Sequence, residues 1–440
     1  MKILSSLKNK INEIVVITLL LVSGVVFIKY LQFLYFPFCW KLGYTLCAAI
    51  GEDFFAFYQA VYNFFHRIFI YGKEASKVLV TPYFMPFKYF PISPFIFGWP
   101  LMLTAQLVKT ITPLTAYNSF LTFNILLHLL GLILIYKLAE RFKNSAVDLA
   151  LAVGFWLTYF PLNSEWRMGQ FNYLASFFFF LAVTAIAYDK EILGAISWIL
   201  SLAWKPLALL AFPYFWKNPK DKRKIGLILF FSLFIVFTLG YLAYFYNYQP
   251  TSFSDFLKTI LNRGDRLGWE VHYIDNFSVS SLLGELFFNS SKNLWQVSVN
   301  IYLGIIIASY LYLSGCLVFK IKSANTDLKI YYLLFSLATM VMLHKEVWES
   351  WLVIWLPIIV TLLLLIKNPR EKFFIFINSI LLATPSLFSV WSMSKTNLWR
   401  FWLIFEKVLP QLCLYLFLTV KLRRKMKEAP TVLTKHFLLS

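Results

Sequence analysis

The chain has 440 residues, of which 60% are hydrophobic, 20% aromatic and only 14% charged. Soluble domains carry about 25% charged residues, so this composition excludes a soluble globular protein and indicates that lipid surrounds much of the chain. The net charge is +20, from 41 Lys and Arg against 21 Asp and Glu. We interpret this excess as the basic cytoplasmic loops of a membrane protein rather than as a nucleic-acid-binding surface.

The apolar segments predict an all-α polytopic protein in which residues 1–440 form a single integral membrane domain. The first span, residues 14–36, follows a basic N-terminus that we place in the cytoplasm. Residues 51–108 then form the first outer loop, where the aromatic-rich run 51–71 is typical of a helix lying in the membrane interface. Further spans are expected near residues 225–246, 296–319, 328–343, 351–366, 373–391 and 400–420. Residues 247–295 are the outer loop after the seventh span, and the basic C-terminal tail is cytoplasmic.

Five apolar runs between residues 91 and 216 allow two topologies. If each run crosses the membrane once, the basic cluster Lys137–Lys143 lies outside, against the positive-inside rule. In the alternative, residues 91–108 stay at the outer surface as a Pro-rich re-entrant segment. Residues 192–216 then break into two short helices at Lys205-Pro206, because proline interrupts a helix. We prefer this second topology, which has twelve spans and gathers several polar groups at the outer face.

Two of these polar groups lie in the first outer loop. Asp53 precedes a helical run, so it is either a helix N-cap or a general base held just above the hydrocarbon boundary. Lys88 and Tyr89 lie in a Pro-stiffened turn, where Lys88 either extends toward water from the membrane surface or binds a lipid phosphate.

Two more groups lie between later helices. The run Glu165-Trp166-Arg167-Met168-Gly169-Gln170-Phe171-Asn172 is either an ordinary loop or a site in which Arg167, Gln170 and Asn172 recognise phosphate or sugar. Lys205 stands inside an apolar run, where a charge is unfavourable and usually faces a cavity or an anion.

These motifs resemble, in order and spacing, those of glycosyltransferase family 87, which includes polyprenyl-phosphate-mannose-dependent alpha-1,2-mannosyltransferases. The resemblance spans roughly residues 45–360. It rests on Gly51-x-Asp53-Phe54-x-x-Phe57-Tyr58-x-Ala60, Lys88-Tyr89-Phe90-Pro91, Gly169-Gln170-x-Asn172, Lys205-Pro206 and Asp275-Asn276-Phe277-Ser278. The chain departs from the family at Ile92, where a second proline is usual. It departs again at His344-Lys345-Glu346, where the family tends to carry Trp-His-His.

The resemblance implies a GT-C-type fold of about 12 transmembrane helices, with the site on the non-cytoplasmic face. Asp53 would deprotonate the acceptor hydroxyl in an inverting transfer. The donor phosphate and the sugars would be bound by Lys88, Tyr89, Arg167, Gln170, Asn172, Lys205, Asn276 and His344. The expected partners are membrane lipids, a polyprenyl- or dolichyl-phosphate sugar that donates a hexose, with mannose as the first candidate, and a glycolipid or glycan acceptor. We expect no nucleic acid, cofactor or metal, since lysine and arginine can neutralise the phosphate.

A polytopic lipid or glycan transporter or flippase is the alternative, because it too would be apolar and basic. Ion-coupled transporters usually need ionisable groups near the bilayer midplane, whereas the acidic residues here lie in loops or at span ends, with Glu406 as the nearest exception. The residue composition favours a prokaryotic plasma membrane as the location.

Overall fold

The computed structural model describes residues 2–35, 51–65, 70–71, 113–217, 231, 254, 276–288, 291–321, 324–385 and 397–430. These residues form helices and turns, with no strand among them. Five helical segments are long and apolar enough to cross a membrane: Lys10–Gln32, Thr115–Arg141, Ala146–Met168, Lys292–Lys320 and Thr326–Leu343. The all-α membrane architecture is therefore confirmed for the described residues, whereas the count of twelve spans stays a prediction.

The N-terminal half of the described chain contains nine helical elements. They are α1 (Lys2–Tyr35), α3 (Glu52–Phe65), α5 (Pro113–Arg141), α6 (Ala146–Thr158), α7 (Phe160–Met168), α8 (Asn172–Ala187), α9 (Glu191–Trp204), the 3-10 helix η2 (Pro206–Ala211) and α10 (Phe212–Lys217).

The C-terminal half contains α14 (Val279–Phe287), α15 (Lys292–Gly315), the π-helical turn η4 (Cys316–Lys320), α16 (Thr326–Leu343), the 3-10 helix η5 (Glu349–Ile354), α17 (Trp355–Leu365), α18 (Pro369–Ala383) and α19 (Asn397–Glu428). The spans predicted after residue 295 overlap these helices. The span predicted near residues 225–246 and the surface segment 91–108 lie outside the described residues, apart from residue 231.

Helix α8 occupies the centre of the bundle because it is apolar on every side. Its sequence, NYLASFFFFLAVTAIA, buries nearly all of its side chains, as expected for a helix surrounded by protein. It packs against α5, α9 and α16. By contrast, α1 and α15 leave large apolar side chains such as Leu21 and Ile305 exposed, and in a membrane protein lipid covers such a surface.

The chain breaks between α9 and η2 at Lys205-Pro206. Lys205 has an extended backbone (φ −153°, ψ 142°) and Pro206 is the first residue of the following 3-10 helix. Proline disfavours the helical conformation in the residue before it, so the local sequence explains the break. The predicted division of residues 192–216 into two short helices is confirmed.

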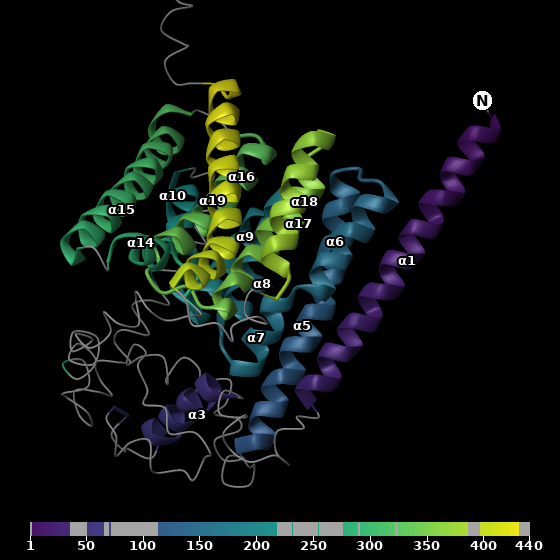
Figure 1. Ribbon diagram of the computed structural model, residues 1–440. Coiled ribbons are helices and arrows are strands. Elements are labelled where there is room, and N and C mark those ends of the chain that lie inside the picture. Colours follow the sequence, from purple (N-terminus) through teal and green to yellow (C-terminus); the bar gives the residue numbers. More distant parts are fainter. Residues whose placement is uncertain are drawn as a thin grey trace, which may run out of the picture.

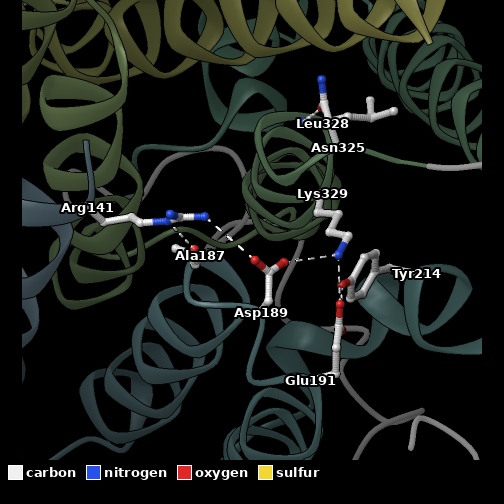
Figure 2. A network of polar contacts seen from close by, with 8 residues as sticks. All are labelled: Arg141, Ala187, Asp189, Glu191, Tyr214, Asn325, Leu328 and Lys329. Carbon is white, nitrogen blue, oxygen red and sulfur yellow. Dashed lines mark hydrogen bonds and ion pairs between the residues drawn. The ribbon is translucent and has the colours of Figure 1, made fainter. Parts of the chain in front are cut away.

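One end of the bundle carries a network of basic and acidic side chains (Figure 2). Arg141, the last residue of α5, lies 3.6 Å from Asp189, and Lys329 of α16 lies 3.7 Å from the other oxygen of the same carboxylate. Lys329 also pairs with Glu191 at 2.8 Å, and Tyr214 donates a hydrogen bond of 2.9 Å to Glu191. The ends of α5 and α8 and the starts of α9 and α16 therefore meet here.

The opposite end of the bundle carries the residues singled out for function. Helix α16 has 18 residues and is about 27 Å long at 1.5 Å per residue, with Lys329 in its first turn and His344 directly after its last residue. Figure 1 shows α3 near the first turns of α5 at one end, with the N-terminus of α1 and the C-terminal end of α19 at the other. The clusters Lys137–Lys143 and Lys320–Lys329 thus share one end, which agrees with the second topology and not with the first.

Candidate active site

Helix α7 ends in a left-handed turn at Gly169 that directs the chain into α8. Gly169 has φ +70°, and the N–H of Gln170 donates to the carbonyl oxygen of Glu165 at 3.1 Å, as in a Schellman motif. A Cβ at Gly169 would lie 2.5 Å from the Cβ of Phe54 in α3. Glycine is needed here both for the backbone conformation and for the close approach of α3.

A second glycine, Gly51, docks the start of α3 onto the same turn. Gly51 has φ +71°, and its N–H donates to the carbonyl oxygen of Arg167 at 2.6 Å. In α5, the hydroxyl of Tyr117 donates to the carbonyl oxygen of Trp166 at 2.8 Å, and the ring of Tyr117 packs against Phe54. These contacts hold the first turn of α3, and with it Asp53, against the junction of α7 and α8.

Four predicted site residues form one continuous chain of side-chain hydrogen bonds. Lys205 Nζ donates to Asn172 Oδ1 at 2.6 Å, and Asn172 Nδ2 donates to Gln170 Oε1 at 2.6 Å. Gln170 Nε2 then donates to Asp53 Oδ2 at 2.8 Å. Gln170 lies in the turn between α7 and α8, and Asp53 is the second residue of α3, so Asp53 is inside the helix and is not its N-cap residue.

A further carboxylate, that of Glu165, lies beside this chain. The side chain is fully buried; its Oε2 accepts from Asn172 Nδ2 at 2.9 Å and its Oε1 accepts from the backbone N–H of Tyr173 at 2.8 Å. Burial lowers the pKa of the Lys205 ammonium, while the charges of Glu165 and Asp53 act in the opposite direction. The site therefore holds a partly buried lysine whose ammonium is stabilised by the charges of two carboxylates.

The same ammonium contacts the ring of Trp351. Lys205 Nζ lies 4.6 Å from the ring centroid, a distance at which a cation is attracted to an indole face. The ring of His344 packs on the same tryptophan, with 4.0 Å between ring centroids. Trp351 thus connects Lys205 with His344, although the two residues are far apart in the sequence.

Asn276 anchors the loop that follows His344. Its Nδ2 donates to the carbonyl oxygen of Lys345 at 3.1 Å, and its Oδ1 accepts from the backbone N–H of Val347 at 3.0 Å. Ser278 donates to the same Lys345 carbonyl oxygen at 2.6 Å. The contacts of Asn276 indicate that it positions this loop; binding of substrate by its side chain stays a prediction.

Arg167 contributes both its backbone and its side chain. Its carbonyl oxygen receives the N–H of Gly51, and its Nε is buried with no hydrogen-bond partner among the described residues. An unpaired buried donor on a cation is unfavourable, so an anion bound beside α7 would remove this penalty.

The structure thus brings together Asp53, Gln170, Asn172 and Lys205 and joins His344 to them through Trp351. Lys88, Tyr89 and Asp275 lie outside the described residues. The sequence patterns gave no role to Glu165 or Trp351; the only signal was that Glu165 begins the polar run that continues to Asn172. Within the described ranges, no group of three or more His, Cys, Asp or Glu side chains is placed to hold a metal ion.

The fold and this site define an integral membrane protein with a polar candidate active site at one end of a helix bundle. The model of glycosyltransferase family 87 matches residues 83–344, more than half of the chain. The chain belongs to this family and is a glycosyltransferase, which decides against a transporter or flippase. No curated protein and no solved structure matches it. The matched region includes Gln170, Asn172, Lys205, Asn276 and His344, and Asp53 joins them through its contact with Gln170.

Proposed function

We propose that this enzyme transfers a hexose, with mannose as the first candidate, from a polyprenyl-phosphate sugar to a lipid or glycan acceptor. Asp53 is the base, and the transfer inverts the anomeric centre. The observation that carries the proposal is the hydrogen-bonded chain from Lys205 to Asp53. This chain places a carboxylate and a cation, the two charges that the reaction needs, at one end of the bundle.

Asp53 would take the proton of the acceptor hydroxyl as its oxygen attacks the anomeric carbon of the donor. The bond between that carbon and the phosphate oxygen breaks, and its electron pair leaves with the polyprenyl phosphate. A positioned carboxylate contributes about 10²- to 10⁴-fold as a general base. The hydrogen bond from Gln170 fixes the orientation of this carboxylate, so that its proton-accepting oxygen is held in place before the substrates bind.

Lys205 and Arg167 would bind the phosphate of the donor. The Lys205 ammonium has three donors, of which one is bonded to Asn172, and the buried Nε of Arg167 has no partner among the described residues. Charge-assisted hydrogen bonds to phosphate are strong in a water-poor site. No metal is then needed to neutralise the leaving group. Lys88 and Tyr89 stay candidates for the same phosphate.

The placement of charge supports a site on the non-cytoplasmic face. The described clusters around Arg141 and Lys329 lie at the end of the bundle opposite to α3 (Figure 1), and such clusters mark the cytoplasmic side of membrane proteins. Both termini would then be cytoplasmic, in a prokaryotic plasma membrane. A lipid-linked donor suits this location, because nucleotide sugars are made and kept in the cytoplasm.

The test is a transfer assay with purified protein and labelled donors. Polyprenyl-phosphate mannose, polyprenyl-phosphate glucose and GDP-mannose are compared with membrane glycolipids as acceptors, and the anomeric configuration of the product is read by NMR. We expect transfer from a lipid-phosphate hexose with inversion. Transfer from the nucleotide sugar alone, or with retention, would overturn the proposal.

A further inference from the structure

Glu165 stands out because it is a fully buried carboxylate in which each oxygen accepts a hydrogen bond. One oxygen accepts the N–H of Tyr173 in the first turn of α8, and the other accepts the amide N–H of Asn172. Burying a carboxylate is unfavourable unless its hydrogen bonds are made. Here both are made, and one of the donors, Asn172, is joined to the proposed base through Gln170.

The orientation of the whole hydrogen-bonded chain follows from the groups at its two ends and from Glu165 beside Asn172. An amide offers an oxygen that accepts and a nitrogen that donates, whereas an ammonium only donates and an ionised carboxylate only accepts. Lys205 therefore requires Asn172 Oδ1 on its side, and Glu165 requires Asn172 Nδ2 on the other. With Asn172 set in this way, Gln170 must turn its oxygen to Asn172 and its nitrogen to Asp53.

We propose that Glu165 is a positioning residue for the glycosyl transfer. It holds Asn172 in the orientation that Lys205 also requires, so that a hydrogen-bond donor and not an acceptor reaches the carboxylate of Asp53. This inference rests on the proposed role of Asp53 as the base. Glu165 touches neither substrate in this account; it acts through Asn172 and Gln170.

The test reverses the direction of the hydrogen bonds made by Gln170 while keeping the net charge of the site and the fold. In Glu165→Gln, the new amide nitrogen at position 165 is a donor that faces another donor, either Asn172 Nδ2 or the N–H of Tyr173. In the double variant Glu165→Gln with Asn172→Asp, the new glutamine donates to the new aspartate and still accepts from Tyr173. Lys205 keeps an acceptor at position 172. Only Gln170 must turn over, which brings its oxygen against the carboxylate of Asp53.

We expect kcat of the double variant to fall by about 10- to 100-fold, as a base displaced by ~1 Å loses up to about 100-fold, while KM for the donor rises by a smaller factor because Lys205 keeps a hydrogen-bond acceptor at position 172. Glu191→Gln is the matched control, since Glu191 is likewise a carboxylate with both oxygens hydrogen-bonded, here by Lys329 and Tyr214, but it lies at the basic end. Thermal unfolding of each purified variant checks that the fold is retained.

Normal kcat in a folded double variant would overturn the inference, because a role in packing or charge balance alone is restored by the second substitution. If the double variant unfolds, Gln170→Glu is measured in its place. Its new carboxylate still accepts from Asn172 Nδ2, and it faces the carboxylate of Asp53 with an acceptor instead of a donor. Normal kcat in that folded variant would also overturn it. Asp53→Asn is measured in parallel. Full activity of Asp53→Asn would refute the proposed function itself, whereas loss there with normal kcat in the double variant would refute only the role of Glu165.

Discussion

Replacing Gly169 by alanine should disconnect the proposed base from the rest of the site. A non-glycine residue in the left-handed conformation costs about 1–2 kcal/mol, and Gly169 has φ +70°. The added Cβ would lie 2.5 Å from the Cβ of Phe54, against at least 3.4 Å for an ordinary contact, so the start of α3 has to move by about 1 Å. Crowding of this kind adds about 1–3 kcal/mol.

A displacement of this size is enough to break a hydrogen bond. Asp53 is one residue before Phe54, so a shift of α3 lengthens its 2.8 Å contact with Gln170. A misplacement of ~1 Å at a reacting group lowers the rate by about 100-fold. We therefore expect kcat of Gly169→Ala to fall by about that factor, measured as initial rate of sugar transfer, with the protein still folded in detergent.

Gly304→Ala is the matched control because, apart from the nearby backbone of α15, no atom of the described residues lies within 4 Å of the added Cβ. Alanine is also the better helix former, by about 1 kcal/mol, so this variant should keep its activity and its thermal stability. Wild-type transfer by Gly169→Ala would refute the claim that the docking of α3 on the turn at Gly169 positions the base.

Three further predictions test the membrane orientation, the basic end and the chemistry. In a background with its cysteines replaced by serine, a cysteine at Lys345 should react with an impermeant maleimide added outside cells and one at Lys143 should not; the reverse pattern would invert the topology. Lys329→Met leaves Glu191 without its 2.8 Å ion pair and should lower stability by about 1–3 kcal/mol, since breaking a buried pair costs up to about 5 kcal/mol, with kcat unchanged. The exposed pair of Lys137 and Glu140 provides its control, because Lys137→Met should change stability by less than about 1 kcal/mol. EDTA should leave transfer unchanged, because cationic side chains bind the phosphate; loss of activity that a divalent ion restores would contradict this.

Much of the architecture could be predicted because the relevant signals are local. Proline at position 206 determines where α9 ends, and the alternation of basic and apolar segments agrees with the grouping of Arg141 and Lys329 at one end. The meeting of Asp53 with Gln170 was expected from motifs that share a predicted face.

The remaining site contacts depend on long-range packing that leaves no local pattern. Whether Glu165 faces solvent or Asn172 depends on the handedness of the turn at Gly169, and a single glutamate at the end of an apolar helix reads equally well as an exposed loop residue. Trp351 reaches Lys205 only because η5 packs against α7 and α8. Asn276 lies in a motif expected to bind substrate, but its described hydrogen bonds are to the backbone of another loop and to its own turn.

The most direct test of the account is the rate of sugar transfer by Asp53→Asn. Asparagine retains the size of the side chain and an oxygen that accepts from Gln170 Nε2, but it cannot take a proton at neutral pH. Initial rates are measured with the polyprenyl-phosphate sugar at saturation, beside Asp189→Asn as the same change at the basic end. We expect a loss of at least about 100-fold for Asp53→Asn and none for Asp189→Asn. Equal transfer by Asp53→Asn and the wild type would contradict the assignment of Asp53 as the base.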